Sequence, residues 1–347
     1  MRRAFRTLPL ALASIALFAG AFAHAGGPGS TSAAYLKLPS GARAIGMGEC
    51  YVAAGDDVQA IGWNPAGIAR VSGREFTFMH AEWFQGIRYE SLAYAQPLMG
   101  FISVGGGVDF LNSGLIDKTT FTQLADMATG PTNDMSNVGT GSSFQVTNVV
   151  VTGCGAVDAS GLRWLPIPGI QAGLNIRALI SKIDRASSAS AVIDLGALWT
   201  PERLPNWTFG IVGQNMGPAI ASASQRTSAS GSSDRVVQKK IPPITFRCGA
   251  AWKSTPKNIV VDLDILVPVD NKPRFSVGGE YWYRKLICFR GGYKFQGRID
   301  LNEYNTGGLE GLSVGTGFRY SIVQLDYAFA TLGFLGATHR LSLTVNF

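Results

Sequence analysis

The stretch from Gly41 to Arg70 reads GARAIGMGECYVAAGDDVQAIGWNPAGIAR, and its composition differs from that of the residues around it. It is rich in small residues, carries the acidic pair Asp56 and Asp57, and closes with the turn sequence Asn64-Pro65-Ala66-Gly67. We expect residues 42–54 to form a short helix with a small-residue face, which the proline then ends because it lacks an N–H. A compact segment with small side chains can pack inside a larger structure.

The residues before this stretch have the layout of an export signal. A basic start precedes an apolar run over residues 8–23, and Ala23-His24-Ala25 fits a small-x-small cleavage site. A membrane anchor is the alternative, but the run is short for a spanning helix and is followed at once by glycine and proline. We therefore expect residues 1–25 to be a cleaved signal peptide.

The overall composition favours an exported membrane protein. The net charge of +7 falls to +4 (7 − 3) without the three leader arginines, and no basic block remains of the kind that nucleic-acid binding requires. Charged residues make up only 15% of the chain and hydrophobic residues 46%, and glycine occurs 43 times. No later stretch approaches the roughly 20 apolar residues of a spanning helix. A closed β-barrel is then the remaining way to satisfy the backbone in lipid.

Alternation of residue types after residues 41–70 supports a barrel. In residues 170–181, 261–267, 274–284 and 323–329, large apolar residues alternate with charged or small ones. A period of two with one apolar face is the pattern of a transmembrane strand, whose other face lines the lumen. The charged residues predicted to face the lumen are Arg177, Asp194, Arg247, Asp262, Asp264, Glu280, Arg284, Arg290 and Arg319.

A soluble β-sandwich also alternates, so it has to be considered. Its solvent face should be rich in Lys and Glu, whereas the second face here is mostly Gly, Ser and Asn with isolated charges. Aromatic residues near predicted strand ends suit the interface girdles of a membrane barrel. These aromatic residues are Trp199, Trp207, Trp252, Tyr281 and Tyr283.

The C-terminal residues favour the barrel further. Leu341, Leu343, Val345 and Phe347 share one face of the last predicted strand. This ending resembles the C-terminal signal that the barrel-assembly machinery recognises in outer-membrane proteins. A chance edge strand is the alternative, but such an apolar edge would promote aggregation of a soluble protein. In a barrel the last strand pairs with the first.

About fourteen strands are predicted, an even number as expected of a bacterial barrel. They cover residues 74–80, 88–97, 101–110, 144–157, 169–183, 189–200, 207–215, 244–253, 258–267, 274–283, 286–295, 312–320, 321–331 and 340–347. The domains are then the signal peptide 1–25, a hatch at 26–72 and the barrel at 73–347. The three longest connections, 114–143, 216–243 and 296–311, all fall on one side, as external loops should.

Residues 41–70 followed by HAEWFQGIRYESLAYAQP at 80–97 resemble the PorV/PorQ branch of the FadL-like outer-membrane barrels. The specific match covers residues 41–97. In that wider family a small N-terminal hatch carrying an Asn-Pro-Ala motif plugs a barrel of fourteen strands. The resemblance implies a hatch motif made of Gly46, Gly48, Asp56, Asp57, Asn64, Pro65, Ala66 and Gly67.

The same resemblance suggests where a lateral opening could lie. FadL-like transporters release hydrophobic molecules sideways through a gap made by an inward kink in a strand beside the hatch. The run Gly105, Gly106 and Gly107, followed by Asp109, is the candidate position, because glycine weakens a strand ladder. The alternative is an ordinary wall position that allows close packing against the hatch.

Catalytic, metal and cofactor chemistry find little support, and we expect none. Of the two histidines left after the leader, His339 begins the last strand, and His80 fits an ordinary polar residue at the end of the first. The carboxylates of Asp56 and Asp57 have no visible partner cluster for a metal, so ion pairing with lumen arginines is the simpler interpretation. The cysteines Cys50, Cys154, Cys248 and Cys288 have no metal spacing; buried free thiols are favoured over a pair between Cys50 and Cys288.

Two functional classes follow for such an outer-membrane protein. The first is a transporter that binds hydrophobic small molecules and passes them beside the hatch. The second follows from the PorV-like resemblance, which implies a shuttle that receives exported proteins during type IX secretion. The long loops are mostly Ser, Thr, Gly and Asn rather than apolar, and this favours transport.

Overall fold

The computed structural model describes residues 27–118, 142–162, 168–184, 186–227, 233–295, 310–333 and 336–347. The predicted signal peptide, and most of the connections 114–143 and 296–311, lie outside these residues, so the predictions made for them stay predictions.

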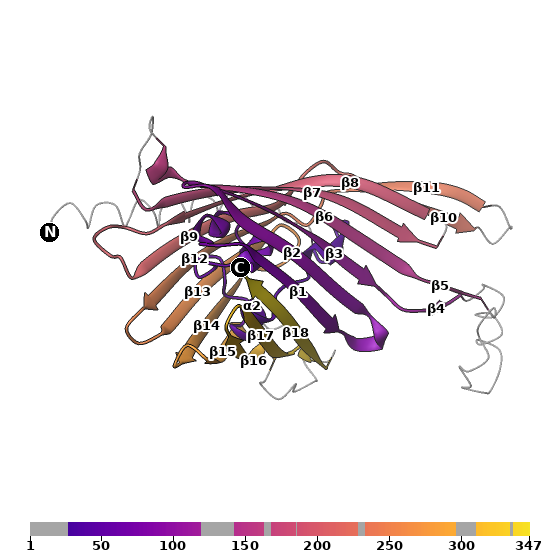
Figure 1. Ribbon diagram of the computed structural model, residues 1–347. Helices are drawn as coiled ribbons and strands as arrows, with labels where there is room; N and C mark the ends of the chain where they lie inside the picture. Colours follow the sequence, from indigo (N-terminus) through magenta and orange to yellow (C-terminus); the bar gives the residue numbers. More distant parts are fainter. Residues whose placement is uncertain are drawn as a thin grey trace.

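Fourteen antiparallel strands form a closed barrel in which β1 pairs with β18 (Figure 1). The barrel strands are β1 (Glu75–Glu82), β2 (Arg88–Met99), β3 (Ile102–Asn112), β6 (Val146–Asp158), β7 (Ile170–Ile183), β8 (Ala186–Trp199), β9 (Trp207–Met216), β12 (Thr245–Ser254), β13 (Ile259–Pro268), β14 (Arg274–Tyr283), β15 (Ile287–Phe295), β16 (Leu312–Tyr320), β17 (Val323–Thr331) and β18 (Ala337–Asn346). The predicted fold is confirmed. The largest boundary differences are three residues, at the starts of β8 (189 predicted, 186 found) and β18 (340 predicted, 337 found).

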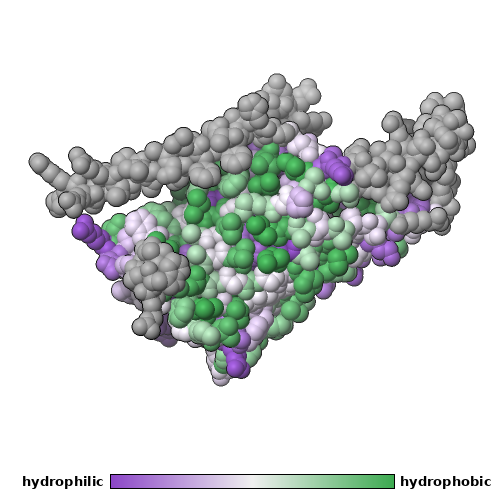
Figure 2. Space-filling view, turned by 90° about the horizontal axis from the view of Figure 1, so that it is seen from above, coloured by the Kyte–Doolittle hydropathy of each residue, from purple (hydrophilic) through white to green (hydrophobic). Residues whose placement is uncertain are grey.

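The apolar face of the strands points outward. On β13, Leu263 is 47% exposed whereas its neighbour Asp262 is fully buried. A β-sandwich would bury the leucine and expose the aspartate, so the alternative fold is excluded. Figure 2 shows apolar residues over much of the face seen from above. The C-terminal residues follow the same rule, since Leu341 and Leu343 are 47% and 42% exposed.

Two small hairpins extend the barrel at one end, on the right of Figure 1. They are β4 (Ile116–Asp117) with β5 (Ser143–Phe144), and β10 (Ile220–Thr227) with β11 (Ser233–Lys240). We call this the long-loop end, and the opposite end, where β1 begins, the short-turn end. The predicted long connection over 216–243 contains a hairpin that the sequence analysis did not include. Its Ser-rich composition hid the hairpin because β10 and β11 are held together by eight residue pairs of backbone ladder rather than by an alternating apolar face.

The N-terminal residues 27–72, called the hatch below, run through the lumen of the barrel. They contain four short helices: η1 (Ala34–Lys37), α2 (Ala42–Gly46), η2 (Val58–Gly62) and η3 (Pro65–Arg70). The predicted helix over 42–54 is therefore wrong beyond its first turn. Gly48 and Glu49 have φ of 69° and 66°, left-handed values that end a right-handed helix. Among the described residues, no helix has the length and apolar character needed to cross a membrane.

Each hatch helix faces a different part of the wall. Helix α2 contacts β15 to β18, η2 contacts β1 to β3, and η3 contacts β3 and β6 to β8. The hatch supplies the largest fully buried side chains of the described residues, Trp63 and Tyr51. The core of the molecule is therefore the hatch itself rather than the interior of a sheet sandwich.

Glycines on the inner wall let the hatch backbone come close. A Cβ on Gly173 would overlap the backbone of Pro65 and Ala66, and a Cβ on Gly46 of the hatch would lie 3.1 Å from the Cα of Gly315. Eight barrel strands supply such glycines. They are Gly105, Gly173, Gly196, Gly210, Gly249, Gly278, Gly292 and Gly315. This ring accounts for part of the high glycine content, because side chains at these positions would keep the hatch out.

We expect Gly173→Ala to destabilise the folded barrel by about 1–3 kcal/mol, because the new methyl group meets hatch backbone that cannot rotate away. The measurement is the urea midpoint of the folded form on unheated electrophoresis gels. Gly153→Ala on neighbouring β6 is the matched control, since a Cβ there meets nothing within 4 Å. Equal midpoints for the two variants would contradict the packing of η3 on Gly173.

Candidate functional site

Arg43 of α2 is the centre of a buried ion network between the hatch and the wall. Its Nε and one terminal nitrogen donate to the two carboxylate oxygens of Glu280 on β14, both at 2.9 Å. Its other terminal nitrogen donates to Asp56 at 2.8 Å and to Asp57 at 2.9 Å. Only 8% of the Arg43 side chain and 1% of the Glu280 side chain are exposed. Three carboxylates thus share one buried guanidinium, and of the three Glu280 is fully buried while Asp56 and Asp57 are partly exposed.

The network continues into the wall on both sides of Arg43. Arg290 on β15 donates to Glu280 and to Asp326 on β17, each at 2.7 Å. At the short-turn end, Lys253 on β12 donates to Asp56 at 2.7 Å. The prediction that Asp56 and Asp57 pair with lumen arginines is therefore corrected: their arginine belongs to the hatch, and the wall supplies a lysine.

The two hatch carboxyls have different electrostatic surroundings. Burial opposes ionisation of Asp56, but Arg43 and Lys253 outweigh it and hold the pKa of Asp56 below its usual value. Burial, together with the neighbouring Asp56, raises the pKa of Asp57 even though Arg43 opposes this shift. Asp56 is therefore the more firmly ionised member of the pair and the firmer partner of Arg43.

A second anchor joins the hatch backbone to β13. One oxygen of Asp264 accepts from the backbone N–H of Tyr51 at 2.8 Å and of Val52 at 3.0 Å, and Asp262 accepts from that of Ala54 at 3.1 Å. These N–H groups would be used inside the helix that the sequence predicted over 42–54. The wall carboxylates bind them instead, which is the physical reason for the shorter helix.

The Asn64-Pro65-Ala66 sequence connects η2 to η3. The Asn64 side chain accepts from the Ala66 N–H at 3.2 Å and caps η3, with Pro65 at the first helical position. Its Nδ2 donates to the carbonyl oxygens of Val52 at 3.0 Å and of Ala197 on β8 at 3.2 Å. Gly67 is needed because a Cβ there would lie 2.8 Å from the carbonyl oxygen of Gly55.

Other wall side chains bind the hatch backbone, and the sequence reasoning did not single them out. Asn175 donates to the Ile61 carbonyl at 2.8 Å, Gln214 donates to the Trp63 carbonyl at 3.0 Å, and Arg340 donates to the Pro39 carbonyl at 2.7 Å. Lys294 also pairs with Glu49 of the hatch at 2.6 Å. Each occupies an inward position of its strand, so alternation could have found the wall residues. Arg43 and Glu49 stand in no periodic pattern.

The predicted lumen charges mostly point inward. Arg177 lies 2.8 Å from Asp194, Arg247 lies over the Trp63 ring with its guanidinium carbon 4.9 Å from the centroid, and Arg319 donates to Gln324 at 2.9 Å. Arg284 is the exception. It is exposed in the three-residue turn between β14 and β15, where it and Lys285 both have positive φ, so the alternation ends one residue before it.

The structure has no gap in the wall at the candidate lateral opening. Strand β3 is paired without a register shift to β6, and with β2 through Gly105, Gly106 and Gly107. The kink expected there is therefore not found. A Cβ on Gly105 would lie 3.1 Å from the Ile61 side chain of the hatch, which matches the alternative of close packing. Asp109 faces the lumen and accepts from the Tyr89 hydroxyl at 3.0 Å.

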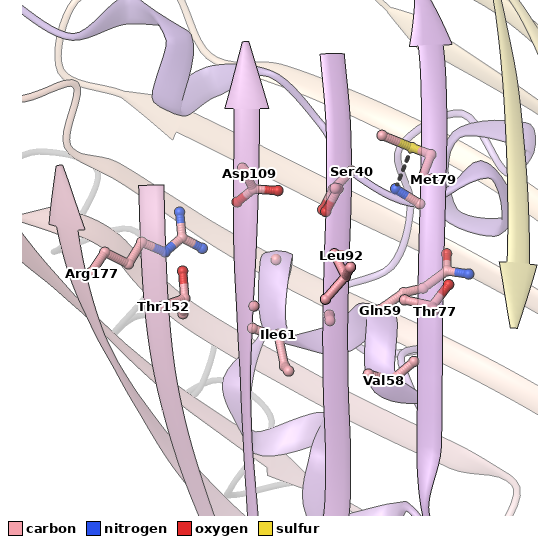
Figure 3. Close-up of a pocket in the computed structure, with 15 residues that line it drawn as sticks. Ser40, Val58, Gln59, Ile61, Thr77, Met79, Leu92, Asp109, Thr152 and Arg177 are labelled. Atoms are coloured by element: carbon pink, nitrogen blue, oxygen red, sulfur yellow. Dashed lines mark hydrogen bonds between the residues drawn. The ribbon is translucent and has the colours of Figure 1, made fainter. Parts of the chain in front are cut away.

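The side of the hatch that faces β1, β2, β3, β6 and β7 is held differently, and we call it the cavity side. An apolar cluster that includes Val58, Ile61, Ala93 and Ala95 joins η2 to β2. Two cavities of ≈ 30 and ≈ 40 Å³ lie beside it. Both are lined by Ser40, Gly62, Asp109 and Arg177. Figure 3 shows Arg177 reaching from β7 toward Asp109 on β3.

Cysteines and metal ligands add no further chemistry to the site. All four cysteines are free, including Cys50 and Cys288, which the sequence left open as a pair. Burial, helped by the carboxylates of β13, raises the pKa of the Cys50 thiol, so this thiol is poorly reactive while the hatch is in place. The described residues contain no group of three or more candidate metal ligands.

Two solved structures of toluene transporters have the same fold as this chain. The toluene transporter TbuX of Ralstonia pickettii matches with a TM-score of 0.61 and 12% identity over 90% of this chain and 100% of that one. The toluene transporter TodX of Pseudomonas putida matches with a TM-score of 0.57 and 11% identity over 92% and 96% of the two chains. This chain shares their fold.

Sequence comparison adds one match. Residues 12–160 match the model of an uncharacterised protein family (UPF0164). No curated protein sequence matches the chain significantly.

We expect Arg43→Met to lower the stability of the folded protein by about 3–5 kcal/mol, because Asp56, Asp57 and Glu280 lose a buried partner. Hatch displacement is measured as maleimide labelling of Cys50 in a background of Cys154→Ser, Cys248→Ser and Cys288→Ser. Lys253→Met is the control. It removes another partner of Asp56, but its side chain is 57% exposed and its loss should cost at most about 1 kcal/mol. Equal labelling of the two variants would show that Arg43 does not hold the hatch.

Proposed function

We propose that this protein is an outer-membrane channel that carries small hydrophobic molecules across the membrane, past the cavity side of the hatch. The observation that carries the proposal is the uneven attachment of the hatch. Ion pairs and carboxylate contacts fix it to β12, β13, β14 and β15. Along β1, β2, β3, β6 and β7 the hatch meets apolar packing, two cavities and a carboxylate contact from Glu75 to the Val58 N–H. A route beside the hatch would open on the second side.

The cavities are smaller than any such passenger. A pocket that binds benzene measures roughly 150 Å³, whereas the cavities here measure ≈ 30 and ≈ 40 Å³. The structure therefore corresponds to a closed channel. Transport requires η2 and the residues around Ser40 to move away from the wall, which would join the two cavities because both already touch Ser40 and Gly62.

The location follows from the same features. A barrel with an apolar outer face suits a lipid bilayer, and in bacteria such barrels reside in the outer membrane. Residues 1–25 would direct the export of the chain and would then be cleaved off. The barrel-assembly machinery would recognise Leu341, Leu343, Val345 and Phe347, of which Phe347 is 60% exposed at the chain end. The fold that this chain shares with two toluene transporters supports a small hydrophobic passenger.

A role as a PorV-like secretion shuttle is the second interpretation of the sequence. Its partner surface would be the long loops, of which residues 119–141 and 296–309 lie outside the described part of the chain. Gentle purification from outer membranes followed by mass spectrometry separates the two roles. A lipophilic molecule in constant ratio to the barrel would support transport, and an exported protein bound to it would favour the shuttle.

We expect Ser91→Phe to reduce toluene uptake to the level of cells without the protein, because Ser91 lines the cavity and a ring there would fill the route. Uptake is measured with labelled toluene in a porin-deficient host. Val108→Phe on neighbouring β3 is the matched control, since Val108 lines neither cavity and is 41% exposed. The folded fraction of both variants is checked on unheated gels. Full uptake by folded Ser91→Phe would place the route elsewhere.

A further inference from the structure

Gln59 of η2 has an unusual environment. Gln59 is 5% exposed, and neither its side-chain oxygen nor its side-chain nitrogen has a hydrogen-bond partner among the described residues. The side chain lines the cavity between the hatch and β1 to β3, and Figure 3 places its amide beside Thr77. A buried amide without partners is costly, whereas an apolar side chain of similar size would have no such cost. The position thus suits a polar occupant of the cavity.

The rest of the lining also departs from what a pure hydrocarbon would need. The hydroxyl-bearing residues Ser40, Ser91 and Thr152 border the cavity next to the apolar side chains of Val58, Ile61 and Met79. A hydrocarbon entering here would cover these polar groups without bonding them. A molecule with an apolar body and one hydrogen-bonding group would match both kinds of lining.

The charges around the cavity favour a neutral group over an anion. Gln59 donates its own backbone N–H to Asp57 at 2.9 Å, and Glu75 accepts from the neighbouring N–H of Val58 at 2.8 Å. Two carboxylates therefore bind the backbone of η2 at the residue that carries the amide and at its neighbour. At the other side of the cavity Arg177 lies 2.8 Å from Asp194, which balances its charge, and Asp109 adds a further carboxylate. A carboxylate-bearing passenger would meet net repulsion.

We propose that Gln59 selects passengers that carry a neutral hydrogen-bonding group, such as a phenol or an alcohol, over hydrocarbons and over carboxylates of the same shape. The inference rests on the proposed transport function. The Gln59 amide can donate to a hydroxyl oxygen through Nε2 or accept from a hydroxyl through Oε1, so it bonds a hydroxyl whichever way the passenger presents it. Val58, Ile61 and Met79 contact the apolar body.

The test compares three molecules with one common ring: toluene, p-cresol and p-toluate. Labelled uptake is measured in a porin-deficient host, as the increment over cells without the protein. For the wild-type chain we expect p-cresol to enter about fivefold faster than toluene, the gain of one neutral hydrogen bond, and p-toluate to enter most slowly. Gln59→Met keeps the length of the side chain and should bring the ratio of p-cresol to toluene close to one.

Thr338→Val is the control variant. Thr338 on β18 also has a buried hydroxyl without a partner among the described residues, but it lines neither cavity. Its removal should leave the ratio unchanged. Equal uptake of toluene and p-cresol by the wild type, fastest uptake of p-toluate, or an unchanged ratio in folded Gln59→Met would each overturn the role of Gln59 while transport stands. No increment for any of the three molecules would overturn the transport function itself.

Discussion

The structure depends on satisfying the backbone of an irregular segment buried inside a barrel. The hatch has only one short α-helix and three 3-10 turns, so many of its N–H and C=O groups have no partner within the segment. The wall supplies those partners: Asp264 takes two N–H groups, while Asn175 and Gln214 donate to carbonyl oxygens. Some inward wall positions therefore carry polar side chains that bond to the hatch backbone, and others carry glycine, which lets that backbone come close to the wall.

This constraint explains why charge and glycine occur together on the inner face. Glu280 and Gly278 are successive inward residues of β14. The first binds Arg43, and the second leaves room for the Met47 backbone, which a Cβ would overlap. An inner face built only of charged residues would hold the hatch at a distance, and one built only of glycine would leave its backbone unpaired. A soluble core needs neither device, because its elements satisfy their own backbone groups.

The strands could be predicted from the sequence because alternation records which face meets lipid, and each strand carries its own copy of the signal. The conformation of the hatch could not be predicted, because it is set by groups far away in the chain. The N–H groups of Tyr51 and Val52 bond to Asp264, more than 200 residues later, and no local pattern contains that information. Arg284 shows the same limit at smaller scale, since the position of a short turn decides whether alternation continues. Gln59 stands out only once its lack of partners is visible.

The uneven attachment also determines which movement can open the lumen. Expelling the whole hatch would separate Arg43 from Glu280 on the wall, and breaking a buried ion pair costs about 3–5 kcal/mol. Moving η2 alone breaks fewer contacts: the bond from Asn175 on β7 to the Ile61 carbonyl is worth about 1 kcal/mol, and the bond from the Val58 N–H to Glu75 on β1 is worth about 1.5–3 kcal/mol. A passenger that returns hydrogen bonds to Gln59 offsets part of that smaller cost. The ionic side therefore serves as the fixed support against which the cavity side can open and close.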